Sequence, residues 1–290
     1  MTERLSDVET RIHTAHQLSA VITAMRGIAA ARTREARGQL EGVRAYAKTI
    51  ATAIGHALAF LPAAERPGAP HQAPGTHVIV VLCAEQGFAG AFNEHVLDAV
   101  QAARHKQPCP RNELLVIGDR GLMIADQRGL TVDWSTPMIA HPAQVANLAN
   151  RIVEALYTRL DAERVVRVTL LHKVPNGSDV LPVVAKQLVP FDFSRFPLPQ
   201  GARAPLITLS PQVLVAKLVE EYIFAEICEA VTLSFAAENE ARMRAMIAAR
   251  SNVEKTLDAL VARSRQLRQE EITNEIVELA GGVITMTAPR

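Results

Sequence analysis

The two ends of the chain carry apolar residues at helical spacing over unusually long stretches. Residues 1–61 contain no proline, and residues 212–280 contain neither proline nor glycine. In the first stretch the apolar positions follow one another in alternating steps of three and four residues, which is the heptad spacing of a left-handed coiled coil. These positions, with Ser19, Arg26 and Thr33 as polar exceptions, are Leu5, Val8, Ile12, Ala15, Ser19, Ile22, Arg26, Ala29, Thr33, Ala36, Leu40, Val43, Ala47, Ile50, Ile54, Ala57 and Leu61. The pattern predicts one very long helix at each end.

The C-terminal stretch repeats this spacing and then changes its phase. The first set is Val253, Leu257, Leu260, Ser264 and Leu267, and the second is Ile272, Ile276, Leu279 and Val283. A phase change of this kind alters the local supercoil. As a helix the stretch extends over roughly 100 Å at about 1.5 Å per residue, several times the width of a compact domain. We therefore expect the two end helices to pair antiparallel, in preference to two separate helices packed on one globule.

Short apolar, β-branched runs fill the middle of the chain. Buried strands are predicted at residues 77–83, 113–118 and 165–171, and helices at residues 91–105 and 143–160. Such alternation is typical of an α/β sheet with covering helices. Residues 180–190 predict a further strand, which we place at an edge because Pro182 limits ladder pairing.

The predicted fold class is therefore α/β, with a long antiparallel coiled coil of N- and C-terminal helices and a central Rossmann-like α/β domain. We assign residues 1–61 to the N-terminal coiled-coil helix, 76–195 to the central domain and 206–286 to the C-terminal coiled-coil helix. The proline- and glycine-rich segment 62–75 and the segment 196–205 are expected to be linkers.

Composition excludes several classes of protein. The 290 residues carry a formal net charge of +1, so the chain lacks the global positive field of nucleic-acid binders, and no nucleic-acid partner is expected. The three cysteines are far apart and form no CxxC pair, which indicates neither a disulfide framework nor a zinc site. The sequence contains no run of about 18 uncharged apolar residues, so no transmembrane helix is predicted. The N-terminus also lacks the pattern of a secretion signal or transit peptide.

The glycines after the first predicted strand, Gly87 and Gly90, fit no phosphate-binding fingerprint. The sequence contains neither GxGxxG nor GxxxxGKS/T, so a tight turn is expected in place of a nucleotide site. Asp119, in the segment IGDRG, is expected to cap the next helix through its carboxylate. Because no catalytic, cofactor-binding or metal-ligating constellation is found, we do not expect the chain to be an enzyme by itself.

Positive charge gathers on the C-terminal helix. Its cations are Arg242, Arg244, Arg250, Lys255, Arg263, Arg265 and Arg268, set against Glu254 and Asp258. One interpretation is an ordinary solvated helix face. The other is a surface that meets the acidic loops of an enclosing partner by steering and screened attraction. The residues alone leave both interpretations open.

Four segments of the chain resemble one known family. Residues 21–36, VITAMRGIAAARTREA, are similar to the ITKAMKMVAAAK-type motif in the first helix of F-type ATP synthase gamma subunits, and residues 268–282, RQEEITNEIVELAGG, resemble their RQAxITxELxEIxxGA signature. Residues 238–246, ENEARMRAM, resemble ENAxxRMxAM, and residues 85–93, EQGFAGAFN, resemble DRGLCGGFN. The segments agree in order, and the resemblance covers nearly the whole chain.

The resemblance implies the central rotating shaft of a rotary F-type ATP synthase or ATPase, which couples ion flow through the membrane sector to ATP synthesis or hydrolysis on the beta subunits. Implied partners are the alpha and beta subunits of the catalytic ring, the epsilon subunit and the membrane c-ring. The implied location is the cytoplasmic face of the bacterial inner membrane, as a peripheral protein without a cofactor. Departures at Arg26-Gly27, Gln86 and Gly281-Gly282 favour a divergent, alternative F-type ATPase branch.

By motif position, the resemblance implies six contacts with the beta subunit. Met25 matches the methionine that faces an acidic loop of beta, and Arg242 matches the arginine of the RM motif. Arg268, Gln269, Thr273 and Glu275 match a polar cluster that hydrogen-bonds to a beta loop. Without the resemblance, the favoured interpretations are coiled-coil packing for Met25 and solvated helix surface for the other five residues.

Two other functions are considered beside the shaft. A coiled-coil scaffold or adaptor unrelated to ATP synthesis shares the long helices but needs no specific C-terminal signature, so the segment ITNEIVELAGG argues against it. An α/β enzyme with helical arms requires a ligand site in residues 77–190, where we expect none.

Overall fold

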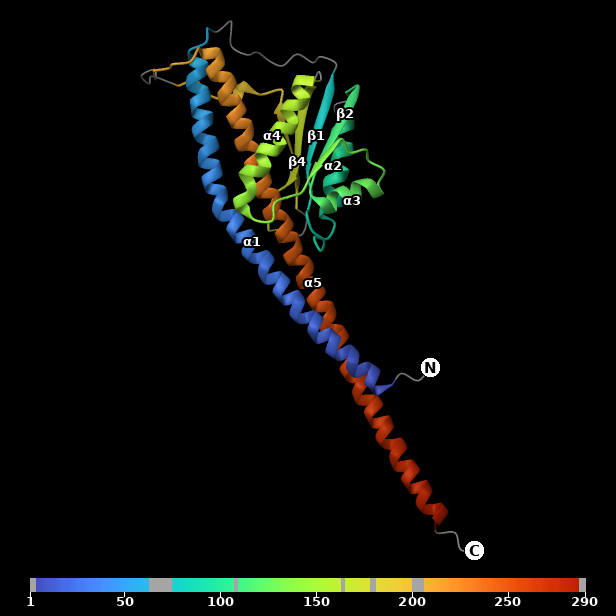
Figure 1. Cartoon of the computed structure of the whole chain (residues 1–290). Helices are drawn as coiled ribbons and strands as arrows, with labels where there is room; N and C mark the ends of the chain where they lie inside the picture. Colours follow the sequence, from blue (N-terminus) through green and yellow to red (C-terminus); the bar gives the residue numbers. More distant parts are fainter. Residues whose placement is uncertain are drawn as a thin grey trace. The chain divides into compact units, whose positions relative to one another are not determined.

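The computed structural model describes residues 4–62, 75–106, 109–162, 165–177, 181–199 and 206–286. Its two longest elements are α1 (Leu5–Ala59) and α5 (Pro211–Met286), which occupy the two ends of the chain as predicted (Figure 1). The last helix begins at Pro211, later than the expected residue 206, because proline has no N–H to lose at the first helical position and its φ is already helical.

The chain divides into two compact units, to which both long helices contribute. The helical unit comprises Met1–Ile28 and Met243–Arg290, and the sheet unit comprises Ala29–Arg242. The division at residues 1–61, 76–195 and 206–286 stays a prediction. The observed boundary falls inside both helices, since parts of α1 and α5 pack with the sheet.

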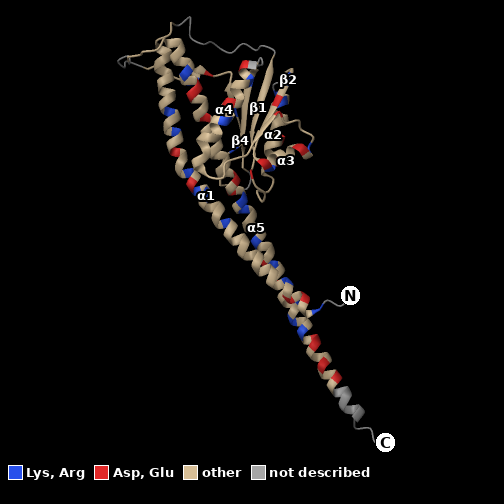
Figure 2. Cartoon of the chain, in the orientation of Figure 1, with Lys and Arg blue, Asp and Glu red and all other residues tan. Residues whose placement is uncertain are grey.

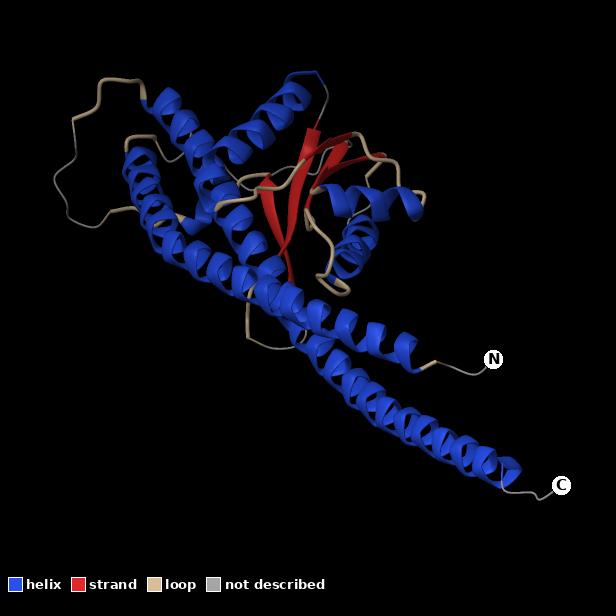
Figure 3. Cartoon of the chain, turned by 60° about the horizontal axis from the view of Figure 1, so that its bottom comes forward, coloured by secondary structure: helices blue, strands red, loops and turns tan. Residues whose placement is uncertain are grey.

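In the helical unit, α1 and α5 run antiparallel (Figures 1 and 3). The predicted seam is the side of each helix that is removed from solvent. The predicted seam positions up to Leu267 are all buried or partly buried, namely Leu5, Val8, Ile12, Ala15, Ser19, Ile22 and Arg26 on α1, and Val253, Leu257, Leu260, Ser264 and Leu267 on α5. Arg268 forms an ion pair of 2.8 Å with Glu9 near the start of α1. The heptad prediction is confirmed up to Leu267. Beyond it, Ile272, Ile276 and Leu279 are exposed, and the side chain of Val283 lies outside the described residues.

The sheet unit contains a five-stranded sheet of order β3-β2-β1-β4-β5. β1 (Thr76–Leu82), β2 (Arg111–Ile117), β3 (Trp134–Thr136) and β4 (Val165–Lys173) are parallel, whereas β5 (Val183–Val189) runs antiparallel to β4 at the edge. The predicted edge strand is confirmed for residues 183–189, while residue 180 lies outside the described residues. The sequence pattern missed β3, which has only three residues.

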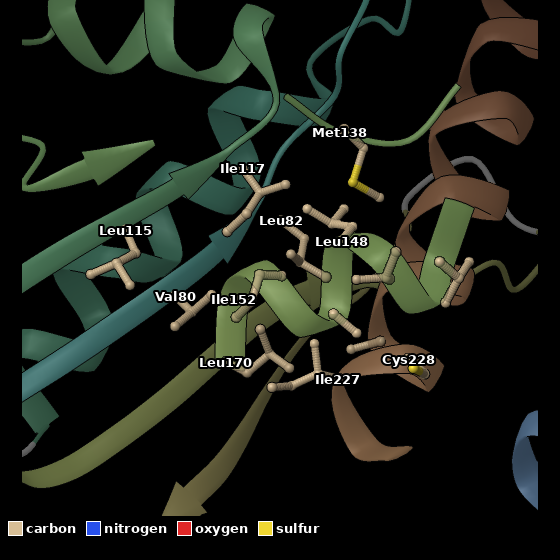
Figure 4. Close-up of a cluster of buried hydrophobic side chains, with 14 of the residues drawn as sticks. Val80, Leu82, Leu115, Ile117, Met138, Leu148, Ile152, Leu170, Ile227 and Cys228 are labelled. Carbon is tan, nitrogen blue, oxygen red and sulfur yellow. The ribbon is translucent and has the colours of Figure 1, made fainter. Parts of the chain in front are cut away.

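Helices cover both faces of this sheet (Figure 3). α2 (Phe92–Lys106) and α3 (Asp119–Gln127) pack on one face, and α4 (Val145–Ala162) and α5 pack on the other. Short 3-10 helices lie at Pro142–Gln144 and Phe193–Arg195. Figure 4 shows the second face, where Leu82 and Ile117 from the strands meet Ile152 from α4 and Ile227 from α5. Burial on both faces explains why the parallel strands are almost uniformly apolar in sequence.

Three side-chain pairs join α1 to α5 within the sheet unit. Arg37 contacts Glu240 at 3.0 Å, Arg44 contacts Glu229 at 2.8 Å, and Tyr46 donates to Glu221. Residue numbers rise on α1 as they fall on α5, so the two helices are antiparallel here too.

Candidate partner-contact surface

The predicted contact residue Met25 lies on α1 in the helical unit, beside the seam. Its neighbour Ile22 is only 6% exposed, and Met25 and Arg26 are partly buried. The side chain is therefore neither a core residue nor a freely solvated one.

Met25 belongs to a second apolar stripe that the sequence analysis did not identify. Leu18, Val21 and Ile28 are 49%, 55% and 54% exposed, and with Met25 they follow one another in steps of three, four and three residues. Residues at these steps share one face of a helix. The sequence contains these apolar residues at helical spacing, directly beside the longer and more regular heptad seam. An apolar stripe outside the seam is a surface that monomeric proteins seldom leave uncovered.

The C-terminal part of α5 carries four of the predicted contact residues. The Arg268 guanidinium is largely exposed and pairs with Glu9, while Gln269, Thr273 and Glu275 are exposed. The Thr273 hydroxyl donates to the Gln269 carbonyl oxygen at 2.8 Å, which satisfies its own proton within the helix. The side chains of Gln269 and Glu275 are exposed and form no hydrogen bond with any described residue.

Apolar side chains are exposed among these polar groups. Ile272, Ile276, Val277 and Leu279 are 52%, 60%, 63% and 72% exposed. Acidic residues follow Arg268 on this part of the helix, after the basic stretch before it (Figure 2). This end of α5 therefore combines apolar contact area with unpaired hydrogen-bonding groups.

Arg242, the remaining predicted contact residue, is buried in the sheet unit at 5% exposure. Its guanidinium forms an ion pair with Glu238, donates to Asn239 Oδ1 at 3.1 Å, and donates to the carbonyl oxygens of Gln86 and Gly87 at 3.4 and 3.3 Å. The interpretation of Arg242 as a solvated cation is therefore wrong. Burial raises the pKa of Glu238, and the neighbouring Arg242 opposes that rise.

The loop that Arg242 holds connects β1 to α2. Gly90 adopts a positive φ of 58°, as expected for a tight turn, but the second left-handed residue is Phe88, with φ of 61°, and not Gly87. Phe88 is also 67% exposed. A bulky residue with positive φ is uncommon and requires support from its surroundings, which the contacts of Arg242 to Gln86 and Gly87 provide.

A second support of this loop corrects the expected role of Asp119. Helix α3 begins at Asp119, and its cap position is Gly118, which has no side chain to act as a cap. The Glu85 carboxylate accepts from the backbone N–H of Asp119 at 3.1 Å and of Met138 at 2.7 Å. A distant carboxylate thus takes the place of the predicted local cap.

Metal-ligating side chains do not cluster in the described part of the chain. No group of three or more His, Cys, Asp or Glu side chains there is arranged to hold a metal ion. Close packing explains the two glycines of the segment IGDRG. A Cβ on Gly118 would lie 2.6 Å from the Cys83 carbonyl oxygen, and one on Gly121 would lie 2.0 Å from the Cys83 Cβ. Among the described helices, none has the length and apolar character needed to cross a membrane.

Comparisons with known proteins identify the family of this chain. A family model described as ATP synthase matches residues 4–286. The ATP synthase gamma chain of Chlorobium luteolum is 28% identical over 292 residues, covering 96% of this chain and 97% of the relative. That of Acidiphilium cryptum is 29% identical over 294 residues, covering 96% and 98%.

Solved structures agree with the fold. A chain of the Euglena gracilis mitochondrial ATP synthase, in a structure of OSCP, F1 and the c-ring, superposes with a TM-score of 0.68 at 14% identity, over 97% of this chain and 94% of that one. A chain of the Tetrahymena thermophila central stalk and c-ring gives a TM-score of 0.57 at 17% identity, over 79% and 99%. The chain therefore belongs to the ATP synthase family, as one of its gamma chains.

Proposed function

We propose that the helical unit turns inside a ring of alternating alpha and beta subunits and that its contacts set the conformation of the beta subunits. As a gamma chain, the protein is the non-catalytic central shaft of the rotary complex, and ATP is made or hydrolysed on beta. What it supplies is a shaped surface.

One observation carries this proposal. The helical unit exposes large apolar side chains on both of its helices, in the stripe of Leu18, Val21, Met25 and Ile28 and at the C-terminal part of α5. Full burial of such a side chain is favourable by about 1.5–3 kcal/mol. In the isolated chain these side chains contact water, whereas an enclosing ring buries them and gains that free energy.

The proposed mechanism is differential contact. Each orientation of an asymmetric shaft stabilises one beta conformation over the others, so torque and nucleotide affinity are linked in both directions. Arg268, Gln269, Thr273 and Glu275 supply hydrogen bonds to a beta loop. Met25 supplies apolar contact beside the seam.

For Arg242 we propose an indirect contact. Because its guanidinium is buried against Gln86 and Gly87, it acts on beta through the loop that it holds and through the exposed ring of Phe88. A direct contact would require the guanidinium to leave Glu238.

The chain acts as part of a membrane-associated complex. We place it at the cytoplasmic face of a bacterial plasma membrane, with the epsilon subunit and the c-ring as further partners. Bacterial gamma chains among its relatives and the c-ring named with the Tetrahymena structure support this placement.

Co-purification tests the proposal. A tagged chain is isolated from membranes of its own host, and ATPase activity and ATP-driven ion transport are measured. The proteins compared are the wild type, a truncation before Arg268, and a control variant, Arg120→Gln, at an exposed position of α3. We expect alpha and beta subunits to co-purify, and the truncation alone to lower ion transport per ATP hydrolysed. Isolation of the chain alone or with unrelated proteins would favour a scaffold and refute the shaft.

A further inference from the structure

A row of polar side chains crosses the sheet at the amino-terminal ends of three neighbouring strands. His77 on β1 is in register with Asn112 on β2 and with Arg167 on β4. Residues opposite one another in register project to the same face of a sheet. Ile79, two residues after His77, packs in the core under α2 and α3, so the row lies on that face.

Several buried polar atoms at this row lack hydrogen-bond partners among the described residues. His77 is 1% exposed, and its Nε2 lies 2.8 Å from the Thr169 hydroxyl, but its Nδ1 has no hydrogen-bond partner among the described residues. The Nε atoms of Arg167 and of Arg104, in the last turn of α2, are likewise buried without a partner there. Buried polar groups are normally paired, because each unpaired one costs the free energy of its lost hydration.

The row also carries positive charge. Burial, and to a smaller extent the positive charges of Arg167 and Arg104, lower the pKa of His77 to about 4. Arg167 donates to Cys109 Sγ at 3.5 Å, and neither arginine forms an ion pair with a described carboxylate. Glu113, the next residue on β2, projects to the opposite face and pairs with Arg159 and Arg111.

Helix electrostatics explains only part of this arrangement. Cations in the last turn of a helix complement its dipole, which accounts for Arg104 and Lys106 on α2. It does not account for Arg167 on a strand, or for the unpaired Nδ1 of His77. A ligand that accepts several hydrogen bonds at once accounts for Arg104, for Arg167 and for the Nδ1 of His77 together.

We propose that this row binds a phosphate group, held by the guanidiniums of Arg104 and Arg167 and by the Nδ1 hydrogen of His77. Guanidiniums suit phosphate because their fork of N–H donors matches two oxygens. When the Thr169 hydroxyl donates to Nε2, the imidazole proton lies on Nδ1, so the neutral ring is a donor. Both arginines are partly exposed, whereas the ring of His77 is buried behind them. The phosphate is either free in solution or the head group of an anionic phospholipid.

The test uses the full-length chain labelled at histidine, with inorganic phosphate as the probe. We expect a saturable shift of the His77 resonance, assigned with His77→Gln, and a rise of its pKa from about 4 as phosphate binds. Arg104→Gln and Arg167→Gln should each weaken binding by about tenfold or more, the range for a lost charged hydrogen bond. Lys106→Gln is the matched control, because it removes the same charge from the same helix end and should leave the affinity unchanged. Circular dichroism establishes that each variant is folded.

A His77 resonance that does not respond to phosphate would overturn the proposal, and so would equal weakening by Lys106→Gln and Arg104→Gln. Vesicles of phosphatidylglycerol, compared with phosphatidylcholine, identify the source. Vesicle binding that inorganic phosphate displaces and Arg104→Gln abolishes supports the lipid head group, whereas a phosphate response without vesicle binding supports free phosphate. None of these measurements depends on the rotor, so they succeed or fail separately from the proposed function.

Discussion

Replacing Arg242 by alanine should destabilise the sheet unit strongly. The substitution removes a guanidinium at 5% exposure and leaves the Glu238 carboxylate, 3% exposed, without its ion-pair partner. Loss of one partner from a buried pair costs about 3–5 kcal/mol, mostly because a buried charge is left uncompensated. The carbonyl oxygens of Gln86 and Gly87 also lose their donor. We therefore expect Arg242→Ala to lower the free energy of unfolding by about 3–5 kcal/mol.

The cause can be separated from a general packing defect by its pH dependence. Burial raises the pKa of Glu238, and Arg242 lowers it, so the pKa rises further in Arg242→Ala. A carboxyl whose folded pKa exceeds its unfolded pKa holds its proton better in the folded state. Stability is then lost as pH rises from the unfolded pKa through the folded one. The cost of Arg242→Ala should be smaller at pH 5 than at pH 8.

The assay is urea unfolding of the full-length chain, followed by the fluorescence of Trp134, the single tryptophan, which lies on β3 in the sheet unit. Glu238→Gln combined with Arg242→Ala should be more stable than Arg242→Ala alone, because the buried charge is gone. A loss below about 1 kcal/mol, the size of an ordinary hydrogen bond, would refute the reasoning. Equal stability of the single and double variants at both pH values would also refute it.

Three further predictions concern the sheet unit and its helices. Gly121→Ala should lower the free energy of unfolding in urea by about 1–3 kcal/mol, because the new Cβ would lie 2.0 Å from the Cys83 Cβ. The control Gly42→Ala has open space around it and should stabilise α1 by about 0.5–1 kcal/mol. Glu85→Ala should cost about 1–3 kcal/mol and speed amide hydrogen exchange at the start of α3, because two backbone N–H groups lose a charged acceptor; unchanged exchange would contradict the cap. Burial lowers the pKa of Lys173 to about 8, so the unfolded state holds the proton between pH 8 and 10.5 and stability should rise with pH there by at most about 1.4 kcal/mol per unit. Lys173→Met should lose this slope, and an identical slope in both proteins would count against the assignment.

Local periodicity predicted the elements that it alone can specify. The heptad steps from Leu5 to Leu61 identified the buried side of α1, and β-branched runs identified β1, β2 and β4. It failed for β3, which is too short to show a period, and it gave the wrong cap for α3, because the acceptor at the start of that helix is Glu85 from a loop distant in sequence. Of the candidate contact residues, the sequence placed Arg268, Gln269, Thr273 and Glu275 on helix surface and Met25 beside the seam, and for Arg242 it gave no sign of burial.

The residue pattern along the chain specifies that two long helices form, which side of each is apolar, and that a buried parallel sheet lies between them in the chain. These properties follow from spacing, and spacing is local. Only the tertiary structure decided that Arg242 turns inward to hold Gln86 and Gly87, and that Phe88 is exposed in a left-handed conformation. It also decided that His77, Asn112 and Arg167 form one row. The physical reason is that a hydrogen bond or strand register joins residues far apart in sequence, and no period along the chain records which partner will be there.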